Sequence, residues 1–230
     1  MFNGKMKAVT FSYDDGVTQD RRLIDILNKY GLKCTFNLNS ELLGTDNHLI
    51  ICDRTISHCK PRACEVREIY DGHEIAVHTL THPNLTKCDE AEIIRQVEQD
   101  RLNLSEIAGY EVVGMAYPSG GVNYNHFVSE TIKKNTGVKY SRTIEASGNF
   151  DLQSNLLEFR PTLRHADFDD LFSLADEFIS LEPAEPKLFY IWGHSYELDI
   201  ENTWDKFEEF CKIISNRDDI FYGTNKEVLL

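Results

Sequence analysis

Two acidic residues directly follow one short apolar stretch of this chain, and two histidines follow another. The run YDDG at residues 13–16 comes after the apolar stretch 7–11, and the run HTLTHP at residues 78–83 comes after the stretch 74–77. Polar groups this far apart in the chain meet readily when both stretches are strands that end at the same edge of a parallel sheet. The sequence therefore predicts an α/β protein with its functional residues at the carboxyl ends of the strands.

Predicted strands and helices alternate along the chain, which favours parallel strands with helices packed outside them. Strands are expected at residues 8–11, 34–38, 74–77, 112–117, 138–142, 188–192 and 221–222. Helices are expected at residues 18–30, 89–108, 124–136, 167–181 and 203–215, the first of them capped by Thr18. Residues 45–67 fit this pattern poorly and are expected to form a long loop or short helices. Because no linker or internal repeat interrupts the chain, we expect a single domain over residues 1–230.

The acidic pair and the two histidines have the composition of a catalytic metal site. His78 and His82 are four residues apart and can meet one ion if the turn between them is helical. One carboxylate of the pair Asp14 and Asp15 would complete a set of three protein ligands, and a fourth position would stay free for water. Structural zinc sites are instead closed by four ligands, often thiolates. The pattern therefore indicates metal-assisted hydrolysis, although it does not say which aspartate binds the metal and which moves protons.

A third run of the same form occurs late in the chain. The apolar stretch LFYIWG at residues 188–193 leads into His194, which places this imidazole at the same expected edge of the sheet. In this order, the runs at residues 13–16, 78–83 and 188–195 resemble the motifs of the polysaccharide deacetylase family, the carbohydrate esterases with a NodB-homology domain. The resemblance implies a distorted (β/α)7-like barrel, in agreement with the alternating elements.

The resemblance also implies a role for each residue of these runs. Asp14 is expected to be the general base, His194 the general acid, and Asp15, His78 and His82 the metal ligands. The implied metal is a divalent ion, with zinc preferred and cobalt or another transition metal as alternatives. The implied reaction is the hydrolysis of an acetyl group from an N- or O-acetylated carbohydrate, with release of acetate.

The chain departs from the family in two of its motifs. The third motif usually contains an arginine that holds the catalytic aspartate, and here Ala116 stands in its place. We expect Arg142, at the end of a predicted strand, to hold Asp14 instead, with Arg160 and Arg164 as alternatives. The fourth motif has no clear counterpart. Contacts with the substrate are expected from Tyr117, Pro118, Ser119 and Trp192.

Composition excludes several partners and favours a cytoplasmic location. The formal net charge of -14 argues against nucleic acid or an anionic membrane as a partner. No apolar run approaches the roughly 18 residues of a membrane span, and the start of the chain lacks the apolar region of a signal peptide. The six cysteines form no C-x-x-C pair and are expected to be reduced thiols, although Cys52, Cys59 and Cys64 near His58 could also bind metal or form a disulfide.

Two other functions remain open beside carbohydrate deacetylation. Some relatives of this fold hydrolyse a small cyclic amide or ureide, and the altered third motif and the expected location make this reaction a competitor. The second alternative is a non-catalytic sugar-binding domain, which retention of base, ligands and acid disfavours. The sequence predicts neither the sugar nor the oligomeric state.

Overall fold

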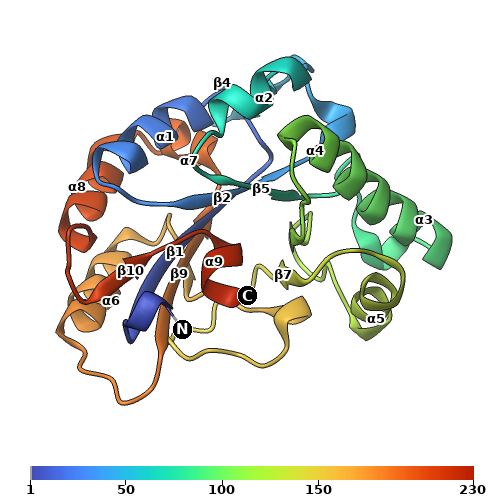
Figure 1. Ribbon diagram of the computed structural model, residues 1–230. Coiled ribbons are helices and arrows are strands. Elements are labelled where there is room, and N and C mark those ends of the chain that lie inside the picture. Colours follow the sequence, from blue (N-terminus) through green and yellow to red (C-terminus); the bar gives the residue numbers. More distant parts are fainter. Residues whose placement is uncertain (1) are drawn as a thin grey trace.

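Residues 2–230 are described by a computed structural model, in which a curled parallel sheet forms the centre and helices cover its outside (Figure 1). The strands follow the order β7-β6-β5-β2-β1-β9-β8, and β10 pairs with the first half of β1. All pairings in this sheet are parallel. Its strands are β1 (Lys7–Asp14), β2 (Cys34–Leu38), β5 (Glu74–Val77), β6 (Gly114–Ala116), β7 (Tyr140–Arg142), β8 (Leu163–Arg164), β9 (Lys187–Gly193) and β10 (Ile220–Tyr222).

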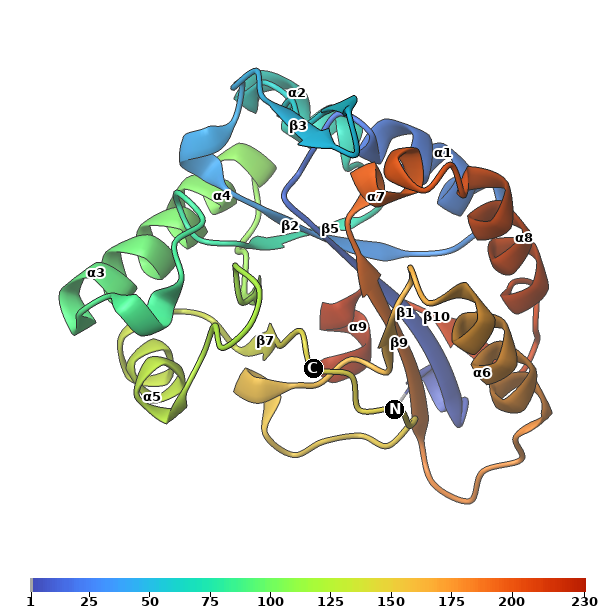
Figure 2. The same cartoon turned by 180° about the vertical axis from the view of Figure 1, so that it is seen from behind.

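Nine α-helices are present within residues 2–230, and most lie around the outer side of the sheet (Figures 1 and 2). They are α1 (Asp20–Lys29), α2 (Ala63–Ile69), α3 (Glu90–Ile94), α4 (Asp100–Ala108), α5 (His126–Asn135), α6 (Phe168–Ser180), α7 (Ser195–Ile200), α8 (Trp204–Ile214) and α9 (Asn225–Leu229). Short 3₁₀ helices cover Phe2–Gly4, Ser40–Leu42, Leu85–Lys87 and Leu156–Glu158.

Burial on both sides explains why the central strands form. Every residue of β1 and β2 is buried, as expected for parallel strands covered by helices on one side and enclosed by the curled sheet on the other. Helix α1 packs against them through one apolar face that contains Leu23, Ile24 and Leu27. Hydrophobic burial of this kind stabilises the fold by roughly 25 cal/mol for each Å² of apolar surface removed from water.

The curled sheet closes through an irregular segment. Strands β7 and β8 do not pair with each other, but Thr143 donates its backbone N–H to the carbonyl of Phe159 at 2.9 Å. Four residues later, Leu163 pairs with Ile191 of β9. Residues 159–163 therefore connect the β7 side of the sheet with β8 and complete the ring of strands. This arrangement confirms the predicted α/β fold with a distorted barrel.

Helix α9 covers the end of the barrel opposite the carboxyl ends of the strands. The backbone N–H of Asn225 donates to Thr35 Oγ1 at 2.8 Å, and that of Lys226 donates to Glu74 Oε2 at 2.9 Å. Thr35 and Glu74 lie at the starts of β2 and β5. A ligand therefore reaches the barrel from the other end, where the motif residues lie.

Two local predictions were wrong, and one predicted helix contains an unexpected turn. Residues 45–67 are not a plain loop, because they contain an antiparallel hairpin of β3 (His48–Ile51) and β4 (Arg54–Ser57), followed by the start of α2. The residue capping α1 is Gln19 and not Thr18. The helix expected at 89–108 is confirmed over residues 90–108, where a π-helical turn at Arg95–Gln99 lies between α3 and α4.

Two further observations concern membrane-spanning helices and the pairing of the cysteines. Across residues 2–230, no helix combines the length and apolarity needed to cross a lipid bilayer. All six cysteines are free, so Cys52, Cys59 and Cys64 form no disulfide.

Candidate active site

The carboxyl ends of the strands surround a cavity of about 590 Å³. Parallel pairing explains the convergence, because β1, β5 and β9 all end at this side of the barrel. Where each of these strands ends, the next residues lie at the cavity. The side chains of these residues face one another across it. The residues lining the cavity include Asp14, Asp15, His78, His82, Tyr117, Ser119, Trp192, His194, Tyr196 and Glu197.

Asp15, His78 and His82 bring three possible metal-ligating atoms within 4.8 Å of one another. Oδ1 of Asp15 lies 3.5 Å from Nε2 of His82 and 3.9 Å from Nε2 of His78. His78 Nδ1 lies 2.9 Å from the carbonyl of Ala116, which can only accept, so the proton is on Nδ1 and the lone pair of Nε2 faces Asp15. Burial lowers the pKa of His78 to about 4, which keeps the imidazole neutral and able to bind a metal. One carboxylate and two imidazoles suit a transition metal such as zinc.

The turn that carries the two histidines is not helical, so the two rings meet without the helical turn that their spacing would have required. Thr79 and His82 adopt positive φ angles of 69° and 62°, a region that side chains other than glycine rarely occupy. Asn39 supports the turn by donating its Nδ2 to the carbonyls of His78 and Thr79 at 2.5 and 2.9 Å. The backbone N–H of His82 donates to Thr79 Oγ1 at 3.1 Å. These contacts hold a strained turn that still brings both rings together, with centroids 4.9 Å apart.

Asp14 is held by a buried arginine. Arg142 Nη2 contacts both carboxylate oxygens of Asp14, at 2.5 Å to Oδ1, and Asn37 Nδ2 donates to Oδ1 at 2.8 Å. Burial alone would raise the pKa of Asp14, but the charges of Arg142, His78 and His194 and the hydrogen bond from Arg142 together hold the pKa below its ordinary value. Arg142 of β7 pairs with Ala116 of the neighbouring parallel strand β6, and Ala116 stands where the family motif has its arginine. The Arg142 side chain therefore starts at the same level of the barrel as that motif position.

His194 is paired with a carboxylate that the sequence analysis missed. Its Nδ1 lies 2.7 Å from Oε1 of Glu197, and its Nε2 lies 3.9 Å from Oδ2 of Asp15. Arg164 contacts both oxygens of Glu197, with Nε 3.2 Å from Oε2. Burial alone would lower the pKa of His194, but the hydrogen bond that Nδ1 donates to Glu197 and the negative charges of Glu197, Asp15 and Asp14 together raise it above its ordinary value. The ring is therefore oriented with Nε2 toward the cavity and Nδ1 toward Glu197.

The hairpin segment adds two cationic or ionisable groups that the sequence analysis also missed. His58 Nε2 lies 3.3 Å from Oδ2 of Asp15, and Lys60 donates its Nζ to the backbone carbonyl of Asp15. Lys60 Nζ is also 3.9 Å from Oδ1 of the same residue. No sequence pattern points to either contact, because neither residue follows a strand of the central sheet. Glu197 did leave a signal, since a glutamate three residues after a helix N-cap is typical of a capping box.

The predicted substrate contacts are only partly gathered at the cavity. Tyr117, Ser119 and Trp192 line it, whereas Pro118 is buried and is not among the lining residues. Ser119 adopts φ 73°, and Asn123 Nδ2 donates to its carbonyl at 2.8 Å. Trp192 is 7% exposed, and the guanidinium of Arg142 lies 4.5 Å from its ring centre.

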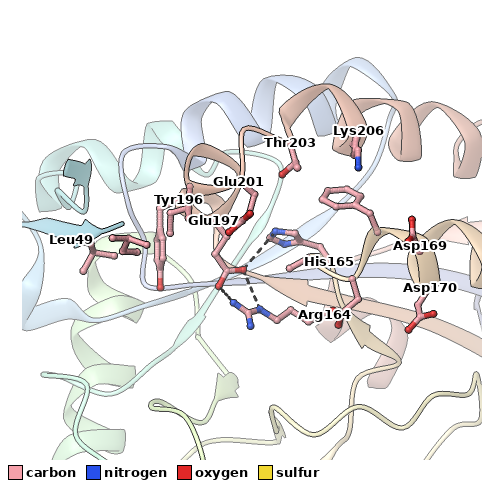
Figure 3. A pocket seen from close by; sticks show the side chains of 15 residues that line it. Leu49, Arg164, His165, Asp169, Asp170, Tyr196, Glu197, Glu201, Thr203 and Lys206 are labelled. Carbon is pink, nitrogen blue, oxygen red and sulfur yellow. Dashed lines mark hydrogen bonds and ion pairs between the residues drawn. The ribbon is translucent and has the colours of Figure 1, made fainter. Parts of the chain in front are cut away.

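A second cavity of about 990 Å³ adjoins the first on the far side of Glu197. Figure 3 shows Arg164 and His165 both directed at the Glu197 carboxylate, with Tyr196 beside it. His165 lines this second cavity, and its ring is buried and stacked on Tyr13 with centroids 5.3 Å apart.

A sequence profile of the polysaccharide deacetylase family matches residues 3–141, which is more than half of the chain. A bifunctional xylanase/deacetylase of Pseudobutyrivibrio xylanivorans is 28% identical over 122 residues, covering 53% of this chain and 18% of that protein. The peptidoglycan-N-acetylglucosamine deacetylase PgdA of Listeria monocytogenes is 24% identical over 119 residues, covering 51% of this chain and 22% of that protein. The chain thus spans only about a fifth of the length of these relatives.

Solved structures share the fold at low sequence identity. PuuE allantoinase superposes with a TM-score of 0.71 and 11% identity, over 97% of this chain and 89% of that chain. A Mycobacterium smegmatis protein assigned to the polysaccharide deacetylases gives a TM-score of 0.65 and 15% identity, over 98% of this chain and 89% of that chain. The region matched by the family profile contains the aspartate pair and both histidines of the HTLTHP run, and it ends before Arg142 and His194.

Proposed function

Because the chain belongs to the polysaccharide deacetylase family, we propose that it is a metal-dependent hydrolase that removes an acetyl group from an N- or O-acetylated carbohydrate and releases acetate. We also propose that residues 1–230 act as one domain of this family. The observation that carries the proposal is the grouping of Asp15, His78 and His82 beside an arginine-held Asp14 and a glutamate-held His194. Family membership alone supports action on carbohydrate acetyl groups, and the grouping supports the metal dependence.

Asp15, His78 and His82 would hold the divalent ion, for which we favour zinc. When bound there, the ion would polarise the acetyl carbonyl and lower the pKa of a water molecule beside it. The neutral Nε2 of His78 and the ionised Asp15 are the protonation states that such binding requires. The direction of both pKa values therefore fits the proposed ligand set.

Asp14 would act as general base and accept a proton from the attacking water. Its low pKa keeps it ionised at neutral pH, and its contacts with Arg142 and Asn37 fix the direction of the carboxylate. Arg142 would act through Asp14 and contributes no proton of its own. A base held in one orientation needs little reorganisation when the reaction occurs.

His194 would act as general acid and donate its proton from Nε2 to the leaving amine or alkoxide. Glu197 keeps the ring protonated and oriented, because its carboxylate accepts from Nδ1 and leaves Nε2 directed at the cavity. The backbone at Ser119, which lines the cavity across from these groups, is the proposed contact for the negative charge that develops on the acetyl oxygen.

Acetate release tests the proposal directly. Protein treated with a chelator should be inactive toward chitooligosaccharides, acetylated peptidoglycan fragments and acetylxylan, and zinc or cobalt should restore the release of acetate. His78→Ala and His82→Ala should abolish both bound metal and turnover, whereas an Arg160→Ala variant, altered at an exposed arginine outside the cavity, should keep both. Full activity in protein free of metal would disprove the mechanism.

Hydrolysis of a small cyclic amide is the second candidate function. The same base, acid and ligand set could open such a ring, and a fold shared with PuuE allantoinase is compatible with this chemistry. The two reactions separate in one assay, because cyclic amides would be opened without acetate release. Turnover of allantoin or related ureides, with no acetate from any acetylated sugar, would favour this second function.

A further inference from the structure

The segment that enters the site from the hairpin is anchored to the first βα loop of the barrel. The backbone N–H of Lys60 donates to the carbonyl of Thr45 at 2.9 Å, and that of Thr18 donates to the carbonyl of Cys59 at 2.9 Å. Gln19 Nε2 also donates to the carbonyl of Ser57 at 2.7 Å. These contacts fix residues 57–60 beside Asp15. The Lys60 side chain, which is 4% exposed, is therefore held in the interior next to the proposed metal ligands.

The two carboxylate oxygens of Asp15 face different neighbours. Oδ2 faces His58 at 3.3 Å and His194 at 3.9 Å. Oδ1 faces His82 at 3.5 Å and His78 at 3.9 Å, and the ammonium of Lys60 is 3.9 Å from this same oxygen. The oxygen that belongs to the metal-ligand group is therefore also the one nearest to a lysine.

The buried charges of the site balance in pairs. Asp14 is compensated by Arg142, and among residues 2–230 Lys60 is the only lysine or arginine within 4.0 Å of the Asp15 carboxylate. A buried carboxylate needs such a counter-charge, because an isolated charge in the interior is costly. A divalent ion at Asp15 would bring further positive charge to a carboxylate that Lys60 already neutralises. Repulsion between the two cations is strong here, because the buried surroundings screen it less than water would.

We propose that Lys60 is the resident counter-cation of Asp15 and that its charge opposes the divalent ion, so that this lysine limits the metal affinity of the site. The inference rests on the proposed metal site. Lys60 would thereby keep the metal-free protein folded, at the expense of weaker metal binding. Removing the charge and keeping the fold should make the site bind metal more tightly.

A supporting role for Lys60 would have the opposite sign. Asp15 adopts a positive φ of 76°, and the ammonium of Lys60 hydrogen-bonds to its carbonyl, so the lysine could instead position Asp15 for metal binding. In that case, loss of Lys60 would weaken metal affinity. Tighter metal binding after loss of Lys60 would therefore indicate electrostatic opposition, and weaker metal binding would indicate that Lys60 positions Asp15.

The experiment is a zinc titration against a chromophoric chelator, at fixed pH and ionic strength, on metal-free protein. Lys60→Met and Lys60→Gln should bind zinc at least about tenfold more tightly than the wild type, which corresponds to about 1.4 kcal/mol. Lys60→Arg keeps the charge and should stay within about threefold of the wild type. Lys33→Met makes the same substitution at a lysine that precedes β2, at the end of that strand away from the cavity, and should leave zinc affinity unchanged.

Thermal unfolding gives a second readout that does not depend on activity. Without zinc, Lys60→Met should unfold at a lower temperature than the wild type, because Asp15 loses its counter-charge. With zinc at a concentration equal to the wild-type Kd, the melting temperature of Lys60→Met should rise by more than that of the wild type. If neither neutral variant folds alone, folding induced by zinc below the wild-type Kd supports the proposal, and no folding at ten times that Kd overturns it.

The outcomes distinguish failure of this inference from failure of the proposed function. If the wild type binds no zinc, or if His78→Ala binds it as well as the wild type, the proposed metal site is wrong. If the wild type binds zinc through His78 and the neutral Lys60 variants bind it equally or more weakly, the metal site stands and the role of Lys60 is refuted.

Discussion

Replacing Arg142 with methionine tests the electrostatic support of Asp14. The Arg142 side chain is fully buried, and it donates to Asp14, to Ser12 Oγ at 3.2 Å and to the carbonyl of Thr143 at 2.9 Å. Methionine keeps much of the alkyl volume and removes the charge and every hydrogen bond. Asp14, which is 2% exposed, would keep only Asn37 as a side-chain donor. The substitution therefore leaves a buried carboxylate without its counter-charge.

The expected loss is large on the scale of protein stability. Removing one partner of a buried ion pair costs about 3–5 kcal/mol, because the remaining charge stays in the interior uncompensated. Typical domains have free energies of unfolding of about 5–15 kcal/mol, so the variant should retain a fold with a clearly reduced denaturation midpoint.

The loss should also depend on pH in a defined direction. In the wild type, the pKa of Asp14 is lowered, so the stabilisation from its ionised form is present above about pH 3.9 and is lost as the pH falls through the folded-state pKa. In Arg142→Met, burial remains and the main lowering charge is gone, so Asp14 takes up a proton at higher pH. The difference between variant and wild type should therefore be largest near neutral pH and shrink on acidification.

Urea denaturation of metal-free protein at neutral and acidic pH measures these quantities. A double-mutant cycle with Asp14→Asn isolates the interaction, since the double variant should lose less than the sum of the two single losses. Arg160→Met is the matched control, because Arg160 is largely solvent-exposed and its pair with Glu145 should contribute less than about 1 kcal/mol. A loss below about 1 kcal/mol for Arg142→Met at neutral pH would refute the reasoning.

Three further predictions concern separate parts of the molecule. Asp15→Asn should lose bound metal, whereas Asp14→Asn should keep it and lose turnover by about 10²–10⁴-fold; the reverse pattern in metal analysis would exchange the two roles. Glu197→Gln should lower the pKa of His194, so the alkaline limb of the activity profile should move to lower pH at unchanged metal content; an unmoved limb would remove Glu197 from the mechanism. Burial lowers the pKa of His73 to about 4, so the stability it contributes is present above about pH 6.5 and is lost as the pH falls toward 4. Urea midpoints of the wild type should accordingly fall over that range more steeply than those of His73→Asn, and equal slopes would exclude this assignment.

Much of the fold was predictable, because the segments whose sequence favours a strand are also the segments that pair and become buried in the folded protein. The strands expected at 34–38 and 74–77 have the bounds of β2 and β5, since both are short apolar runs flanked by polar or turn-forming residues. Once these strands are parallel, Asp14, His78 and His194 must lie at one end of the barrel, whatever the details of the loops. The approximate arrangement of the site thus followed from the positions of the motifs relative to the strands.

Tertiary structure alone selected the groups that hold these residues. Three arginines were candidates to support Asp14, and the sequence could not rank them by contact. Arg142 reaches Asp14 because it pairs with Ala116 across two strands, whereas Arg164 pairs with Glu197 and Arg160 lies near Glu145. Each choice depends on strand register and burial, which are set by pairings between distant segments.

The sequence by itself determined the α/β barrel, the end of it that carries the site, and the chemical types of the groups gathered there. It did not determine which charges compensate Asp15 and His194. Lys60 follows the hairpin, where no periodicity or spacing marks it, and the spacing of Glu197 in the first turn of α7 indicates a helix cap but not its contact with His194. Motif residues are specified by short local patterns, whereas the electrostatic environment of a buried group depends on every segment folded against it. For that physical reason, only the three-dimensional structure decided how the charges of this site are balanced.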